Sequence, residues 1–203
     1  MNFSFLFKTQ KTADLLIAGL GNPGKQYAHT PHNAGFEVID YIREAFKEQD
    51  IPLQEEHRKE YALYTASYNG QQILLVKPLL FMNASGTVVR KLKKQYDVPY
   101  EKIWVIHDEI DLPLGTIRVN FNSQSAGNKG VQNIIDELQT KRFHRFRIGV
   151  LPPNTSKQAI KEATSDFVTT PLGAPIRTLF ESSLQECSLL VIQSVLEGNP
   201  IKR

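Results

Sequence analysis

Four polar side chains stand beside predicted turns, and together they are suited to chemistry at a carbonyl group: His32, Asp108, Asn22 and Asn83. A neutral imidazole can take a proton, a carboxylate can hold the ring and stabilise its charged form, and side-chain amides can donate to an oxygen that becomes negative. The four residues are far apart in the chain, so this hypothesis requires a fold that brings them together.

The expected position of His32 follows from the two residues before it. Thr30 is a favourable N-cap and Pro31 suits the first helical position, which predicts a helix that begins near residue 31. His32 then lies in the first turn, where the positive end of the helix dipole disfavours imidazolium. We therefore expect His32 to stay neutral near pH 7, as a general base must. The alternative is a solvent-facing histidine without a role.

The other three polar residues lie near the ends of predicted strands. Asn22 comes just after the apolar run 14–20, Asn83 lies where a strand or turn passes into a helix, and Asp108 lies at the end of the apolar run 102–109. In open α/β sheets this edge is where sites form, so the three side chains are expected to meet His32 there.

Simpler interpretations of these residues stay open. Asn22 precedes a proline and suits a turn, and Asn83 suits a helix cap. A metal site is a further alternative, although neighbours on a strand point to opposite faces. Its ligands would be His107, Asp108, Glu109 and Asp111.

Three glycines after the first apolar run spell G-x-G-x-x-G, at Gly19, Gly21 and Gly24. In a dinucleotide-binding loop the helix must start within the glycines, so that its N-terminus meets the pyrophosphate. Here residues 25–33 carry no helical apolar period, and no Gly-Lys-Ser/Thr follows. A nucleotide-dependent oxidoreductase therefore remains a minor alternative.

Predicted strands and helices alternate along the chain. Strands are expected at 14–20, 61–68, 71–78, 102–109, 115–121 and 146–151, and helices at 34–48, 85–96, 131–140 and near 173–198. Asn69-Gly70 predicts a hairpin between two of the strands. The pattern indicates an α/β fold, a single domain with a twisted mixed β-sheet flanked by helices on both faces. We expect residues 1–13 to form an N-terminal extension of the domain 14–203.

Composition narrows the class of protein further. Of 203 residues, 41% are hydrophobic, and the formal net charge is +3. No apolar run approaches the roughly 20 residues that span a bilayer, so no membrane association is expected. The single cysteine, Cys187, cannot form an internal disulfide and is expected in the core, which favours a reducing, cytoplasmic compartment.

Five ordered segments resemble the bacterial-type peptidyl-tRNA hydrolases: "GLGNPGKQY…HNAGF", "FMNASG", "HDEIDLP", "G-x-x-N" ahead of a helix, and "FHRFRIGV". The resemblance covers about residues 14 to 151 and continues into a helical C-terminus. It implies a monomer that cleaves the ester between peptide and tRNA, with no metal and no cofactor.

The same resemblance assigns roles to individual residues. His32 would activate water, and Asp108 would orient the ring of His32. Asn22 and Asn83 would bind the substrate ends and position the water or the oxyanion. The cleft for the peptide and the terminal nucleotide would be lined by Tyr27, Phe81 and Met82.

The chain also departs from the family at two places near this site. Pro31 stands where the family usually has arginine, and Asn128 and Lys129 replace the usual His-Asn of a glycine-rich loop. Lys129 can donate to an oxyanion or a phosphate, but it cannot accept a hydrogen bond. The altered loop leaves a second hypothesis, a non-catalytic RNA-binding relative of the same fold.

A cluster of basic residues at 141–147 is the expected contact with tRNA phosphates. If this segment is extended, Arg145 and Arg147 share a face and His144 lies opposite. Together with Asn128 and Lys129 these arginines are predicted to bind the substrate without reading its sequence. The alternative is a solvated edge, or arginines paired with nearby acids.

Overall fold

The computed structural model describes residues 11–156, 158 and 162–201, and these fold around one seven-stranded sheet. The strand order is β2-β3-β4-β1-β5-β7-β6, with β1 parallel to β4 and β5, and β5 parallel to β7. The remaining pairs are antiparallel. The strands are β1 Leu15–Gly19, β2 Leu53–His57, β3 Tyr61–Tyr68, β4 Gln71–Pro78, β5 Ile103–Pro113, β6 Ile117–Phe121 and β7 His144–Leu151.

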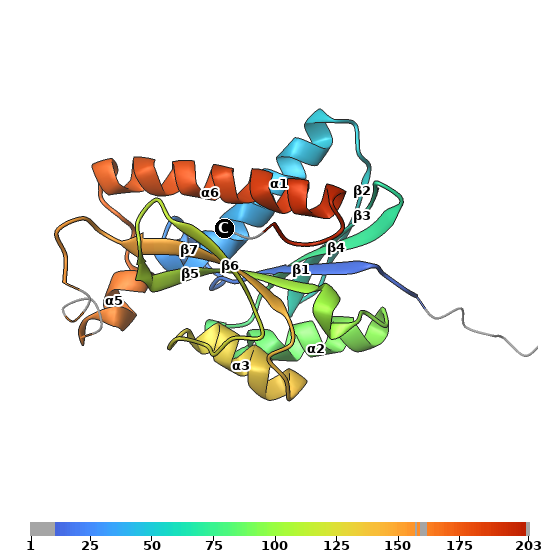
Figure 1. Ribbon diagram of the computed structural model, residues 1–203, viewed down its shortest axis with the longest axis horizontal. Coiled ribbons are helices and arrows are strands. Elements are labelled where there is room, and N and C mark those ends of the chain that lie inside the picture. Colours follow the sequence, from blue (N-terminus) through green and yellow to red (C-terminus); the bar gives the residue numbers. More distant parts are fainter. Residues whose placement is uncertain (1–10, 157, 159–161, 202–203) are drawn as a thin grey trace, which may run out of the picture.

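Helices cover both faces of this sheet (Figure 1). On one face lie α1 (Ala34–Glu48) and α6 (Ala174–Leu196), and on the other lie α2 (Ser85–Gln95) and α3 (Lys129–Leu138). The short helix α5 (Thr164–Thr169) sits at one end of the sheet. Short 3-10 turns join the elements: η1 Lys25–Tyr27, η2 Pro31–Asn33, η3 Met82–Ala84 and η4 Tyr100–Lys102.

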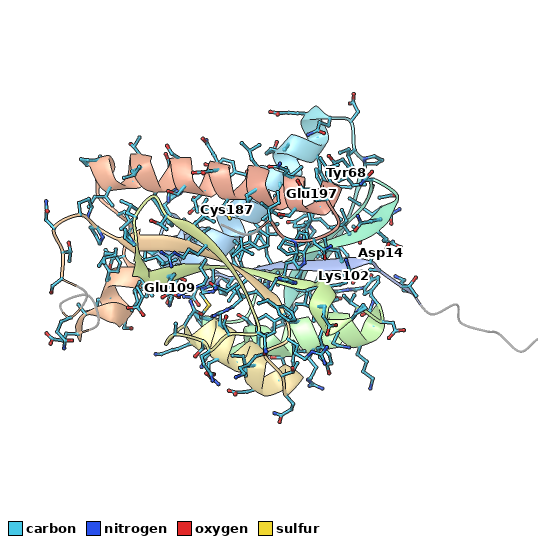
Figure 2. The ribbon with its side chains drawn as sticks, in the orientation of Figure 1. Asp14, Tyr68, Lys102, Glu109, Cys187 and Glu197 are labelled. Carbon is cyan, nitrogen blue, oxygen red and sulfur yellow. The ribbon has the colours of Figure 1, made fainter. Side chains whose placement is uncertain are left out.

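The apolar residues of the sheet divide into two cores, one under each helical layer. The central strand β1 reads LLIAG and is buried along its whole length, as expected for a parallel strand covered on both sides. Its alternate residues point to opposite layers, Leu15 and Ile17 toward α1 and α6, and Leu16 and Ala18 toward α2 and α3. Cys187, a residue of α6, belongs to the first core (Figure 2).

The glycines after β1 serve packing and a turn. A Cβ on Gly35, in the first turn of α1, would overlap the backbone of Leu20 and Ile106, and one on Gly19 would overlap the backbone of Gly35. The start of α1 therefore lies directly against the end of β1 and against Ile106 within β5. Gly24 adopts a positive φ of 111°, which glycine accepts without strain.

This close approach gives a prediction for stability. Gly35→Ala is expected to lower the free energy of unfolding by about 2 kcal/mol, because backbone atoms cannot move aside for the added methyl group. Gly173→Ala is the control for a methyl group added in open space, since nothing lies within 4 Å of a Cβ there; as the N-cap of α6 it should lose only the smaller capping preference of glycine over alanine. Urea denaturation of both variants measures the difference. Equal midpoints would contradict the packing argument.

The predicted elements are confirmed except for a few local features. Helix α1 has the bounds expected from its apolar spacing, the Asn69-Gly70 hairpin joins β3 and β4, and Cys187 is buried. The predicted helix start near residue 31 is wrong in type, because Pro31–Asn33 form the 3-10 turn η2 that precedes α1. Strand β2, which is short and mostly polar, was not expected from the sequence. Thr30 occupies the cap position of η2, but its hydroxyl donates to the Tyr27 carbonyl and does not cap the helix.

The ends of the chain bear on the expected extension. Residues 1–10 lie outside the described residues, whereas Ala13 is buried and its N–H bonds the Tyr96 carbonyl. Within the described part of the chain, no helix combines the length and the apolar character needed to cross a membrane.

Candidate active site

The loops after β1 and β4 and the start of α1 are tied together by Asn22. Its backbone N–H donates to the Asn33 side-chain oxygen at 2.8 Å, and its own Oδ1 accepts from the Met82 N–H at 2.8 Å. Asn33 returns a hydrogen bond from Nδ2 to the Asn22 carbonyl. Because Asn33 follows His32 and Met82 precedes Asn83, one buried asparagine fixes the segments that carry two other predicted site residues.

His32, in η2, and Asp108, in β5, form a hydrogen-bonded pair. The distance from His32 Nδ1 to Asp108 Oδ2 is 2.9 Å, across 76 positions of sequence. The Asp108 side chain is only 2% exposed, and the His32 side chain is 13% exposed. The predicted approach of the carboxylate to the imidazole is therefore confirmed.

The protonation of the pair follows from its geometry. The pKa of Asp108 lies below its usual value: burial acts to raise it, but the charge and hydrogen bond of His32 outweigh burial. An ionised carboxylate can only accept, so Nδ1 of His32 carries the hydrogen. In the neutral ring the free lone pair then lies on Nε2.

The expected effect of the helix dipole, which disfavours imidazolium, is opposed at His32 by Asp108. Burial lowers the pKa of His32, but the charge and hydrogen bond of Asp108 outweigh burial, and the pKa lies above 6.5. The nearby charge of Lys129 opposes this rise. The ring is therefore more basic than a free imidazole, which moves it toward the pH at which a general base works best.

Asn128 holds the other oxygen of the acid. Its Nδ2 donates to Asp108 Oδ1 at 3.1 Å, while its Oδ1 accepts from the N–H groups of Gly130 and Val131 at the start of α3. Asn128 was predicted to bind substrate. Among the described residues its side chain contacts the acid and the start of α3, and it also lines the neighbouring pocket, so the substrate contact stays a prediction.

A pocket of about 340 Å³ opens beside the pair, between residues 108–110 of β5, the loop before α3, and α5. Figure 2 shows Glu109 toward this end of the sheet. The lining residues are His32, Asp108, Glu109, Ile110, Ala126, Gly127, Asn128, Lys129, Glu162, Ser165 and Val168. The His32 side chain thus borders a space in which a small group can bind.

The predicted cleft residues lie outside this pocket. Phe81 is 58% exposed and meets the edge of Tyr27, with ring centroids 6.3 Å apart. Asn83 is also exposed, in η3. Met82 is buried in the second core, so its contribution at the site is the backbone N–H that holds Asn22.

The predicted tRNA contact at Arg145 is contradicted by its burial. Arg145 is 2% exposed, its guanidinium donates to the Ser123 hydroxyl, and burial lowers its pKa to about 10. Arg147 shares its face, as expected, but is paired with buried Glu109 at 2.9 Å and with Asn120. The alternative of an arginine paired with a nearby acid is therefore confirmed for Arg147, whereas Arg145 is buried and hydrogen-bonded to Ser123.

Sequence patterns missed the far wall of the pocket. Glu162, Ser165 and Val168 come from a segment without a clear motif, and Ile110 follows the acidic run as an ordinary apolar residue. Only the three-dimensional fold brings α5 against η2. No group of three or more His, Cys, Asp and Glu side chains arranged to hold a metal ion occurs among the described residues.

Comparison with known proteins gives a consistent set of relatives. A family model described as peptidyl-tRNA hydrolase matches residues 16–201. The peptidyl-tRNA hydrolase of Bacillus subtilis is 39% identical over 184 residues, which are 90% of this chain and 95% of the relative. That of Listeria monocytogenes is 41% identical over 154 residues, 75% of this chain and 79% of the relative.

Solved structures agree with the sequence matches. The crystal structure of the peptidyl-tRNA hydrolase from Acinetobacter baumannii superposes with a TM-score of 0.74 at 30% identity, covering 93% of each chain. A peptidyl-tRNA hydrolase crystallised with n-propanol gives a TM-score of 0.78 at 29% identity, covering 91% of this chain and 89% of the other.

Proposed function

The chain belongs to the peptidyl-tRNA hydrolase family, and from this premise we propose that His32 is the general base that activates water for cleavage of the peptidyl-tRNA ester. One observation carries the proposal: the 2.9 Å contact between His32 Nδ1 and Asp108 Oδ2 beside an open pocket. The contact leaves the lone pair of Nε2 available to a water molecule.

The proposed reaction transfers one proton in two steps. Nε2 of His32 takes a proton from water as the water oxygen bonds to the ester carbonyl carbon. Asp108 stabilises the imidazolium that forms. As the tetrahedral intermediate collapses, the bond to the ribose oxygen breaks and the imidazolium returns the proton to that oxygen. The products are a peptide acid and tRNA with a free hydroxyl group.

The asparagines are proposed to handle the charge that develops in this step. The Oδ1 of Asn22 is occupied by the Met82 N–H, so its Nδ2 remains to donate to substrate. Exposed Asn83 directly follows Met82 in the turn η3. An amide donor aimed at the oxyanion stabilises the transition state more than the ground state.

Flat side chains and one exposed cation are proposed to hold the ends of the substrate. The exposed ring of Phe81, braced by Tyr27, offers a stacking surface for a base or an apolar peptide side chain. Lys129 lines the pocket and is exposed, so its ammonium is placed to contact a phosphate or the oxyanion. Buried Arg145 is not proposed as a contact.

We further propose that residues 14–203 act as one catalytic domain, as a monomer in the cytoplasm. The single sheet with a helical layer on each face supports one domain. Light scattering after size-exclusion chromatography tests the monomer, which should give a mass near the 23.0 kDa of the chain.

The direct test is hydrolysis of N-acetylated aminoacyl-tRNA, measured as release of the labelled acyl amino acid. The proposal requires turnover by the unmodified chain without an added cofactor. RNA binding without turnover would instead favour the non-catalytic relative. That alternative gives no physical reason for a buried acid that holds a histidine at a pocket.

Lys129 provides a graded test of the electrostatics. Because its charge lowers the pKa of His32, Lys129→Asn should raise that pKa and move the acid limb of kcat/KM to higher pH. The expected shift is small, since an exposed charge is partly screened. Full pH profiles of both proteins measure it, and an unmoved or lowered acid limb would contradict the assignment. A large gain in rate would show that Lys129 restrains turnover.

A further inference from the structure

The side-chain amide of Asn128 lies between the first N–H groups of α3, which need an acceptor, and the carboxylate of Asp108, which needs a donor. Its Oδ1 accepts from the N–H groups of Gly130 and Val131, at 3.0 and 3.1 Å, in the first turn of α3. Its Nδ2 donates to Asp108, at 3.1 Å to the carboxylate Oδ1 and at 3.4 Å to the backbone carbonyl. One amide therefore joins the start of a helix to the acid that holds His32.

The orientation of this amide is fixed by its partners. A flipped amide would place its NH₂ group against the two N–H donors of α3 and its oxygen against the carboxylate. Both ends would then be repulsive. The helix N-terminus thus determines that a donor, and not an acceptor, points at Asp108.

The carboxylate is consequently held at both oxygens. Asn128 binds Oδ1, and Oδ2 is left to face the His32 ring. We infer that Asn128 is a positioning residue, which aims Asp108 at His32 and transmits the fixed position of α3 to the catalytic base. This inference rests on the proposed function of His32.

The backbone of Asp108 is held by contacts that do not involve Asn128. The proposed role of Asn128 therefore concerns only the carboxylate side chain of Asp108. The Asp108 carbonyl also accepts from His107 Nδ1 at 2.6 Å, and Asp108 lies in the β5–β7 ladder opposite Ile148. Loss of the Asn128 amide would therefore free the carboxylate to rotate while the strand stays in place.

The isosteric variant Asn128→Asp separates capping from positioning. Aspartate keeps the acceptor for Gly130 and Val131 and is favoured at a helix N-terminus, but it offers no amide donor to Asp108 and adds negative charge beside it. We expect kcat to fall roughly 10- to 100-fold, with KM changed less than about 3-fold. The acid limb of kcat/KM should move to higher pH, because the added charge favours imidazolium.

Asn128→Ser provides a neutral second variant. Serine also caps helices well, but its short side chain does not carry the amide that reaches Asp108. Its kcat should fall as well, without the electrostatic shift of the acid limb. Asn133→Ala is the matched control, because Asn133 lies on the same helix and accepts from the Gly86 N–H, away from the acid. It should lose thermal stability while keeping kcat and the pH profile.

The outcomes separate this inference from the proposed function. All variants are assayed beside the unmodified chain and His32→Ala, with N-acetylated aminoacyl-tRNA as substrate and thermal melts as the measure of folding. An inactive unmodified chain would overturn the proposed function. If the unmodified chain is active and both Asn128→Asp and Asn128→Ser have the kcat of the unmodified chain, only the role of Asn128 is overturned. Low kcat in both variants, with Asn133→Ala active, supports it.

Discussion

Replacement of His32 by alanine is expected to lower kcat for hydrolysis of N-acetylated aminoacyl-tRNA by about 10³-fold. The variant removes the only side chain proposed to take the proton from water, while Asn22, Asn83 and the pocket walls remain. Because these groups bind the substrate, KM should change much less than kcat. Single-turnover rates at saturating enzyme measure the chemical step directly.

The loss of His32 also removes the partner of a buried acid, so a variant that preserves folding is needed. His32→Gln keeps an amide donor for Asp108 but has no basic nitrogen, and it should be as inactive as alanine with a higher melting temperature. His57→Ala is the matched control, since His57 is an exposed histidine on β2 paired with Glu55. Full activity in His32→Gln would contradict the proposal that His32 is the general base.

Asp108→Asn is expected to have the second largest effect, a fall in kcat of about 10²- to 10⁴-fold. The amide has the shape of the carboxylate but cannot stabilise the imidazolium that forms during the reaction. It can also present its NH₂ group to Nδ1, which would select the tautomer with the hydrogen on Nε2 and leave no base toward the water.

The same substitution has a defined effect on pH dependence. Asp108 is the cause that raises the pKa of His32 against burial and the charge of Lys129. Its removal should therefore lower that pKa, and the acid limb of the residual kcat/KM should move to lower pH. Asp40→Asn is the control for loss of an ion pair elsewhere, since Asp40 pairs with Lys77 and Arg43. An unchanged acid limb in Asp108→Asn would contradict the claim that Asp108 raises the pKa of His32.

The architecture could be predicted because its signals are local. Apolar runs at β1 and β5, helical spacing in α1, and Asn69-Gly70 each depend on neighbouring residues only. Strand β2 carries no such signal. Its residues LQEEH are mostly polar, and they form a strand because the edge of β3 supplies hydrogen bonds.

The chemistry of the site could be predicted in part, because residue types and the positions of strand ends are also local signals. The types of His32, Asp108 and Asn22 indicate their chemistry, and the ends of parallel strands indicate where they meet. Burial and pairing at a distance are not encoded locally. The sequence could not show whether the helix dipole or the carboxylate of Asp108, 76 positions away, has the larger effect on the pKa of His32. Nor could the strand pattern show that Arg145 is buried beside Ser123 of the loop after β6.

The central claim is that a neutral His32, raised in basicity by Asp108, takes the proton from water. The most direct test is NMR titration of the His32 ring together with the pH profile of kcat/KM. The account predicts one shared pKa, above 6.5 in the unmodified chain and lower in Asp108→Asn. A His32 pKa that differs from the acid limb, or that does not respond to Asp108→Asn, would contradict it.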